Sequence, residues 1–435
     1  MLIYTPNITP RLQYILDTIL PLETVLVDDP EKFRQYPGAR INYSANPVSD
    51  QEFRIVPHSL LTETGIGEQD ISCFTWNGLK AFFKSPGDAG FDIFAAAFYL
   101  ITRYEEYLPN IPDAYGRFAH RSSLAYREGF LKIPIVDLWV IELGKMIARK
   151  FPGFRFPERR FRFVPTYDID IAYSYRYHSL KDRIGGLLKN ILQARGSALK
   201  ERLEVLFRKR EDPFDTFQFL DQLTETFGLD PIYFFLMAEK RKGYDKNISP
   251  HHPAMKQLIG KLASRNQIGI HPSWQSGDDP NILKKEIRLL SFLGDRMIRA
   301  SRQHYIRMTL PGTYRLLLEN GIQDDYSMGY GSINGFRAST SVSFFWYDLE
   351  KESQTGLRIH PFCYMEANSY FEQRDRPEQA ADELRQYFEV VRSVNGALIT
   401  IFHNHLITQQ QPWRDWRKLY HDFLIQNFSG SNGEN

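Results

Sequence analysis

Two aspartates, Asp168 and Asp170, come directly after a short apolar run that is rich in aromatic residues, Phe161–Tyr167. Such a run is typical of a buried strand, and parallel α/β sheets and barrels carry their chemistry at the carboxyl ends of strands. Residues i and i+2 of a strand point to the same side, so both carboxylates can converge on one small volume. Because neighbouring negative charges raise each other's pKa unless a cation or a proton lies between them, the pair suits a metal ligand beside a general base. An aspartate pair of this spacing also caps helices, so further residues have to support the site.

Other side chains that could do chemistry follow later β-like runs of the chain. In chain order they are His271, Arg302, His304, Asp324, Asp325, Arg337, His403 and His405. Each alone has an ordinary structural explanation, since a histidine at a strand end is usually hydrogen-bonded and an arginine is usually paired. Their placement at consecutive strand ends is much less expected by chance. The glycines at 329, 331 and 335 do not predict a nucleotide loop, because neither Gly-Lys-Ser/Thr nor a strand–helix context accompanies them.

The elements that must position these residues alternate between β-like and helical runs. The expected strands are Phe161–Tyr167, Pro231–Met237, Gln267–His271, Met297–Gln303, Gly321–Ser327, Phe336–Thr340, Leu357–Tyr364 and Ala397–His403. The expected helices between several of them are Phe217–Phe227, Ala254–Ser264, Asn281–Phe292 and Pro377–Ser393. Alternation of this kind from residue 160 to residue 425 predicts a parallel, barrel-like α/β domain.

A smaller α/β domain is expected over residues 1–155, where short strands mix with helices. Its clearest helix is Phe91–Leu108, and Pro134–Lys150 is expected to be another, with the proline tolerated in the first turn. Residues 151–157 contain prolines and a glycine and are expected to link the two domains. The polar tail at 429–435 is expected to be disordered.

The composition is that of an ordinary globular chain. The chain has 435 residues, 43% hydrophobic and 24% charged, and a formal net charge of +2, so no electrostatic argument favours nucleic acid as a partner. Two cysteines, Cys73 and Cys363, provide neither a disulfide framework nor a zinc-ribbon spacing. No signal peptide and no stretch of 18 apolar residues is visible, so we expect a cytoplasmic protein.

One basic segment interrupts the larger domain at 178–212. Between residues 181 and 210 there are nine lysines and arginines against three acidic residues, and the apolar side chains keep a helical spacing. A basic amphipathic helical hairpin can make a peripheral contact with an anionic membrane. It can equally pack its apolar stripe on the barrel and keep its charges in water, and this second interpretation is favoured.

The order of these motifs resembles the polysaccharide deacetylase superfamily (carbohydrate esterase family 4). Five motifs carry the resemblance, and they are Thr166–Asp170, His271–Gln275, Arg302–Tyr305, Asp325–Ser327 and Ile399–His403. The family implies a deformed (β/α) barrel with a divalent metal, most often Zn²⁺, that removes N- or O-acetyl groups from sugars. The N-terminal part, through Leu100–Tyr107 and Asp113–Phe118, resembles an uncharacterised domain found ahead of bacterial deacetylases.

The resemblance implies a role for each matching residue of the first three motifs. Asp170 and His271 would bind the metal, and Asp168 would be the base that deprotonates the attacking water. Arg302 would orient Asp168 through a charge-assisted pair. The backbone amide of Tyr167 would face the oxyanion.

The last two motifs imply the acid that completes the reaction. His403 would protonate the leaving amine or alkoxide, assisted by Asp325, and His405 would lie behind it or on the surface. Further residues expected beside the substrate or the ligands are Trp274, Gln275 and Arg337.

The chain departs from the family at one metal ligand. The second histidine of the family, four residues after His271, is Gln275 here, and an amide oxygen is a poor zinc ligand beside imidazole. Three explanations remain: His304 or His360 supplies the missing nitrogen, the metal is held weakly, or the protein is a catalytically inactive relative that binds carbohydrate. If position 275 still faces the ion, a histidine there should tighten metal binding.

The main functional hypothesis is therefore a metal-dependent hydrolase acting on an acetylated saccharide. One alternative is a non-catalytic protein for carbohydrate binding or exopolysaccharide assembly. Another is an amide hydrolase acting on a cyclic small molecule, because related barrels cleave ureides and imides.

Overall fold

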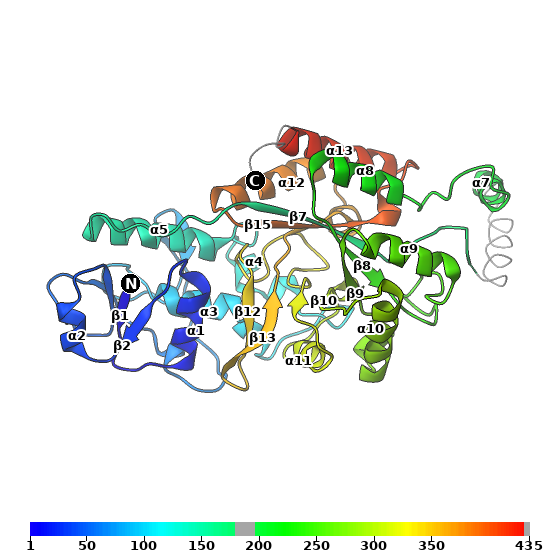
Figure 1. Ribbon diagram of the computed structural model, residues 1–435. Coiled ribbons are helices and arrows are strands. Elements are labelled where there is room, and N and C mark those ends of the chain that lie inside the picture. Colours follow the sequence, from blue (N-terminus) through cyan, green and yellow to red (C-terminus); the bar gives the residue numbers. More distant parts are fainter. Residues whose placement is uncertain (179–195, 430–435) are drawn as a thin grey trace.

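The computed structural model describes residues 1–178 and 196–429, which form two mainly parallel sheets with helices packed around them (Figure 1). A third sheet is an antiparallel pair of short strands, β5 (Phe74–Trp76) and β6 (Leu79–Ala81). Of the predicted basic hairpin at 181–210, the described part contains one helix, α7 (Gly196–Leu206), and residues 181–195 lie outside the described residues. Residues 430–435 of the expected tail also lie outside them. Within the described ranges, no helix is long and apolar enough to cross a membrane.

The larger sheet has nine strands in the order β12-β13-β11-β10-β9-β8-β7-β15-β14, and it confirms the predicted α/β fold class. The strands are β7 (Arg162–Ile169), β8 (Ile232–Leu236), β9 (Gln267–His271), β10 (Ala300–Ser301), β11 (Asp324–Asp325), β12 (Phe344–Asp348), β13 (Ser353–Ile359), β14 (Tyr364–Met365) and β15 (Ala397–His403). All neighbours pair in parallel except β12, which pairs antiparallel with β13 at one edge. No pairing in the described chain joins β14 to β12 or β13, so the sheet is not a closed barrel.

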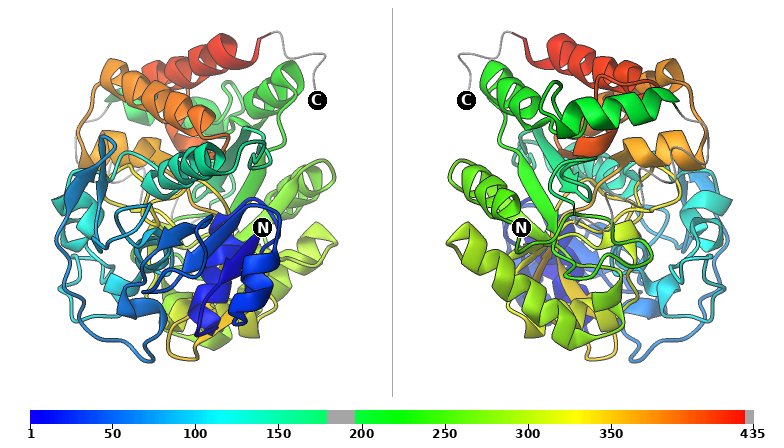
Figure 2. Two further views of the ribbon diagram at one scale, coloured as in Figure 1. Left: turned by 90° about the vertical axis from the view of Figure 1, so that its left-hand side faces the viewer. Right: turned by 90° about the vertical axis from the view of Figure 1, so that its right-hand side faces the viewer.

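Helices cover the outer side of this sheet (Figures 1 and 2). They are α8 (Phe217–Phe227), α9 (Pro253–Ala263), α10 (Pro280–Gly294), α11 (Gly312–Glu319), α12 (Pro377–Ser393) and α13 (Trp413–Phe428). Their ends follow local chemistry: Asp279 accepts a hydrogen bond from the Asn281 amide at the start of α10, and Gly228 ends α8 with a φ of 61°. Four of the predicted helices are confirmed, with bounds that differ by at most two residues.

The alternation of side chains along the strands separates two apolar layers. Tyr167 and Ile169 of β7 pack in the large outer core beneath the helices. The other face encloses a small apolar cluster that includes Phe234, Ile399 and Ile401. Polar side chains on this inner face therefore have to lie at the carboxyl ends of the strands, above the apolar cluster.

The N-terminal part has its own sheet, in the order β2-β1-β3-β4. Its strands are β1 (Leu2–Tyr4), β2 (Val25–Val27), β3 (Arg40–Tyr43) and β4 (Phe53–Ile55), and its helices include α1 (Pro10–Ile19), α3 (Ile93–Ile101) and α5 (Ile135–Lys150). It packs on the β12–β13 edge through α1, and the hydrophobic cores of the two parts are continuous. A partly buried ion pair joins them, with Arg11 Nε 2.9 Å from Glu352 Oε2. The expected smaller domain is thus joined to the larger one by core packing and an ion pair.

Three predicted elements are wrong. The single strand predicted over Leu357–Tyr364 is divided between two strands that do not pair with each other, because β13 ends at Ile359 and β14 begins at Tyr364. The helix predicted to reach Leu108 ends at Ile101, because Arg103 adopts a left-handed conformation with a φ of 56°. Residues 336–340 do not form a strand but a turn that contains Ser339 at a φ of 56°. The helix predicted from Pro134 is confirmed as α5, with the proline as its cap.

Candidate metal and catalytic site

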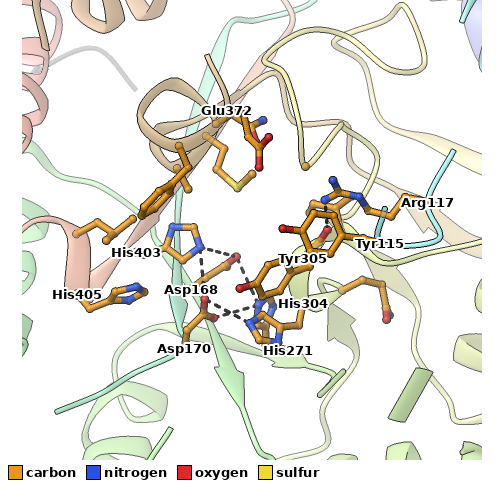
Figure 3. Close-up of a pocket in the computed structure, with 18 residues that line it drawn as sticks. Tyr115, Arg117, Asp168, Asp170, His271, His304, Tyr305, Glu372, His403 and His405 are labelled. Atoms are coloured by element: carbon orange, nitrogen blue, oxygen red, sulfur yellow. Dashed lines mark hydrogen bonds and ion pairs between the residues drawn. The ribbon is translucent and has the colours of Figure 1, made fainter. Parts of the chain in front are cut away.

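Predicted residues from four strand ends, those of β7, β9, β10 and β15, converge on one pocket of about 340 Å³ at the carboxyl edge of the sheet (Figure 3). Its charged walls include Asp168, Asp170, His271, His304 and His403. Asp168 and His403 are register partners on the neighbouring strands β7 and β15, so their side chains lie next to each other on the inner face. The prediction from strand ends therefore placed these residues together correctly.

Asp170, His271 and His304 form a group that could hold a metal ion. Their candidate ligand atoms all lie within 4.8 Å of one another. His271 Nε2 is 3.1 Å from Asp170 Oδ1, and His304 Nε2 is 3.6 Å from Asp170 Oδ2. One carboxylate oxygen and two imidazole nitrogens are a ligand set that suits zinc and related divalent metals.

Two polar residues behind His304 orient its ring. His304 Nδ1 lies 3.2 Å from Asp245 Oδ1, which fixes Nε2 toward Asp170. Gln275 donates from its amide to the other Asp245 oxygen, at 3.1 Å, and to the carbonyl of Lys240. Gln275 thus supports the carboxylate that holds His304. One expectation assumed that position 275 faces the ion, but the side chain of Gln275 faces Asp245 instead.

His360, the other candidate for the missing ligand, lies elsewhere. Its Nε2 is 2.8 Å from Asp324 Oδ1, its Nδ1 contacts Ser343, and its ring stacks on Tyr326. It lines a separate pocket together with Arg358 and not the one that contains Asp170. Of the two alternatives that the sequence left open, the geometry favours His304.

Asp168 is held as expected of a general base. Arg302 donates from Nη1 to Asp168 Oδ1 at 2.9 Å and to Thr166 Oγ1 at 2.6 Å, and its Nε donates to the carbonyl of Tyr326. The guanidinium is fully buried and lies 4.5 Å from the ring centroid of Phe234. Only Asp168 Oδ2 is left to face His271 and His403, at 3.9 and 4.0 Å.

His403 has a different partner from the one expected. Its Nδ1 lies 2.9 Å from Glu366 Oε1, and its backbone amide donates to the same oxygen. Asp325 instead accepts hydrogen bonds from Ser301 and Ser327 and does not line the pocket. Glu366 follows the two-residue strand β14 directly, and no pattern in the sequence singled it out.

Three other expected site residues lie away from the pocket. Tyr167 pairs with both neighbouring strands, so its amide lies in the plane of the sheet and is not presented to an oxyanion. Arg337 is buried against Glu106, with Nε 2.8 Å from Oε1. Trp274 does not line the pocket itself, and its ring is tilted by 42° against that of Tyr244 at a centroid distance of 4.4 Å.

His405 lies in the wall of the pocket and not on the surface. Its ring centroid is 5.6 Å from that of His403. Burial lowers the pKa of His405 to about 3, and the charge of His403 acts in the same direction. The ring is therefore neutral at neutral pH and cannot act as a proton donor there.

Neighbouring carboxylates keep His403 protonated. Burial alone would lower the pKa of His403, but Glu366, Asp170 and Asp168 outweigh it and raise that pKa to about 10. Burial would likewise raise the pKa of Asp170, yet His304 and His271 hold it well below its usual range. His403 is thus a charged donor and Asp170 a full anion at neutral pH.

Metal affinity should depend on pH. Asp170 and Asp245 outweigh burial and raise the pKa of His304 to about 9, whereas a metal binds only neutral imidazole. Below that pKa each bound ion must displace a proton, so we expect affinity to rise by up to about tenfold per pH unit between about pH 6 and pH 9. Calorimetric zinc titrations in buffers of different ionisation enthalpy measure both the affinity and the released protons. An affinity that is constant over this range would contradict the assignment of His304.

The residues behind His304 allow a second prediction. Asp245→Asn should weaken metal binding by about 10- to 100-fold, because the partner of the Nδ1 proton is lost. Gln275→His should not tighten binding, because this side chain faces Asp245. Zinc affinity measured against a competing chelator checks both variants. Tighter binding by Gln275→His would show that position 275 reaches the ion.

Two of the solved structures that match this chain are of candidate polysaccharide deacetylases, and another is of an allantoinase. A candidate polysaccharide deacetylase from Mycobacterium smegmatis matches with a TM-score of 0.40 and 13% identity over 62% of this chain and 86% of its own. Puue allantoinase matches with a TM-score of 0.38 and 11% identity, over 62% and 85%. A second candidate polysaccharide deacetylase, from Pseudomonas aeruginosa PAO1, matches with 0.37 and 12%, over 62% and 85%. Because these TM-scores are below 0.5, we infer the function from the site residues and not from the likeness.

Sequence comparison identifies the N-terminal part alone. No curated protein matches the chain. Residues 1–152 match the model of a family of unknown function, DUF7033, which confirms the predicted resemblance of this part to an uncharacterised domain.

Proposed function

We propose that this protein is a divalent-metal-dependent hydrolase that removes acetyl groups from an acetylated saccharide. The observation that carries the proposal is the convergence of three candidate ligands with two further residues, Asp168 and His403. Each of these two is fixed by an oppositely charged partner, Arg302 for Asp168 and Glu366 for His403. An inactive carbohydrate-binding protein would not need this arrangement.

The residues present fit a zinc-type metal. Asp170, His271 and His304 are buried or nearly so, and all three candidate ligand groups border the pocket, where a water and a substrate oxygen can enter. When bound, such a metal acts as a Lewis acid and lowers the pKa of a coordinated water. Zn²⁺ is the proposed ion because imidazole and carboxylate suit it.

The chain's own residues would move the protons. Asp168 takes the proton of the attacking water through Oδ2, since Arg302 already occupies Oδ1. His403 donates a proton from Nε2 to the leaving nitrogen or oxygen, and Glu366 holds the opposite ring nitrogen and stabilises the positive charge. The two residues lie 4.0 Å apart, so a scissile bond above them can be reached by both.

The rim of the pocket favours a saccharide. Tyr115, Tyr244, Trp274 and Tyr305 form an aromatic cluster with ring centroids 4.4 to 6.1 Å apart. Tyr244 and Tyr305 remain 40% and 38% exposed. Exposed ring faces beside polar groups suit the apolar faces and hydroxyls of sugar rings.

Acetate release tests the proposal. Purified protein is incubated with acetylated chito-oligosaccharides or acetylated xylan, with zinc or cobalt and with a chelator. We expect metal-dependent release of acetate, and loss of both stoichiometric metal and release in Asp170→Ala and His271→Ala, which each remove a ligand. His360→Ala is the matched control, because that histidine lies at another strand end outside the pocket.

Two outcomes would overturn the proposal. Absence of acetate release on every substrate together with absence of bound metal would exclude the enzyme. Hydrolysis of a cyclic ureide or imide without acetate release would favour the amide hydrolase instead.

A further inference from the structure

The N-terminal part contacts the loop that carries the metal ligand His304. Its Asp113–Phe118 segment reaches the pocket, where Tyr115 and Arg117 lie beside Tyr305 (Figure 3). Arg117 Nη1 donates to the backbone carbonyl of Tyr305 at 2.6 Å, and Tyr305 directly follows His304. Arg117, which lies in the part that matches DUF7033, is thus hydrogen-bonded to the residue that follows the candidate ligand His304.

The Tyr305 loop has a backbone conformation that needs support. Tyr305 and Ile306 have φ values of 59° and 53°, in the left-handed region that residues with a Cβ rarely adopt. Two such residues in succession, one of them β-branched, persist only when surrounding contacts impose them. Their conformation sets the direction in which His304 leaves the loop.

Arg117 is itself rigidly held. Its Nε donates to Asp113 Oδ2 at 2.7 Å and its backbone amide to Asp113 Oδ1 at 3.0 Å. Only 4% of the residue is exposed, and the guanidinium lies 4.7 Å from the ring centroid of Tyr115. The arginine therefore presents a fixed donor to the Tyr305 carbonyl.

Gly331 makes this approach possible. A methyl group on its Cα would overlap the Arg117 guanidinium and lie 2.8 Å from the Tyr305 carbonyl oxygen. No positive φ requires a glycine at this position, so its role is to leave space for the arginine. Two further contacts join the N-terminal part to the segment around Gly331. His120 is hydrogen-bonded to Ser332, and Glu106 is paired with Arg337.

We infer that the DUF7033 part completes the metal centre, with Arg117 as a positioning residue that holds the Tyr305 loop so that His304 faces Asp170. The inference rests on the proposed function, because it takes the three-residue group as a metal site. It also assigns a role to the Asp113–Phe118 segment, for which the sequence alone indicated a resemblance to an uncharacterised domain but no function.

Metal affinity tests the inference without relying on turnover. Zinc affinity, from competition with a chelator, is compared for the full-length protein and the variants Arg117→Ala and Gly331→Ala. We expect both variants to bind about tenfold more weakly or worse, since each releases the loop of one ligand. Arg117→Lys keeps a donor for the carbonyl and should bind with intermediate affinity.

Matched controls separate this effect from general destabilisation. Arg121→Ala removes an exposed arginine of the same N-terminal part, and Gly260→Ala adds a methyl group in open space on α9. Both should bind zinc as the wild type does. Thermal unfolding of every variant shows whether the fold is intact.

A double-mutant cycle with His304→Ala shows how Arg117 acts. If it acts through His304, Arg117→Ala should cost little further affinity in the His304→Ala background. Wild-type affinity in folded Arg117→Ala or Gly331→Ala protein, or fully additive losses in the cycle, would overturn the inference. Absence of zinc binding by the wild type would instead contradict the proposed function, so the two failures are distinguishable.

Discussion

Replacing Asp168 by asparagine should lower turnover by about a thousandfold while leaving bound metal unchanged. The amide keeps the shape of the side chain but cannot accept the proton of the attacking water, and a positioned base contributes roughly 10²- to 10⁴-fold. Asp168 is not one of the three candidate ligands, so metal content should remain stoichiometric. Steady-state kinetics of acetate release and metal analysis on the same preparation measure both quantities.

Asp324→Asn is the matched control for this variant. Asp324 also lies in a strand of the same sheet, β11, but it pairs with His360 outside the pocket, so its substitution should leave turnover within a fewfold of wild type. Near-normal turnover of Asp168→Asn would show that another group is the base. Loss of the metal in that variant would show that Asp168 is a ligand.

Replacing His403 by alanine should lower turnover by about a hundredfold or more, with a much smaller effect on KM. The imidazolium protonates the leaving group, so its loss raises the barrier of the chemical step and not the cost of binding. A larger loss in His405→Ala would show that the acid is misassigned, because His405 borders the same pocket.

Glu366→Gln tests the partner of His403 separately. Burial lowers the pKa of His403 and Glu366 is the first of the groups that raise it, so the variant should lower this pKa. The acid then loses its proton at lower pH, and the alkaline limb of kcat/KM should move to lower pH. An unchanged limb would mean that His403 is not the group that titrates in this limb.

The strands and helices with a strong periodic pattern could be predicted from the sequence. β9, α8, α12 and β15 have the predicted bounds, because an alternating or helical apolar pattern continues to a clear end in each. β10 and β11 are much shorter than predicted, since their chains leave the sheet soon after reaching the site. At Arg103 the backbone conformation of a single residue ended a helix whose apolar pattern continued.

The candidate site was predictable to the extent that it follows strand ends. Asp168, Asp170, His271, Arg302 and His403 each end or follow a recognisable strand, and the parallel sheet brings such ends together. The partners of these residues were not predictable in this way. Asp245 lies in a loop, Glu366 follows a two-residue strand, and Arg117 comes from the other part of the chain, so only the tertiary structure places them.

The position of the metal tests the central claim most directly. A crystal structure of the full-length protein with zinc, with anomalous data on both sides of the zinc absorption edge, locates the ion without assumptions about substrate. We predict one strong anomalous peak bound by Asp170, His271 and His304, at about 2.0 to 2.2 Å from each ligand atom. A zinc ion bound through Gln275 or His360, or absence of a peak at Asp170 in protein saturated with zinc, would contradict this assignment.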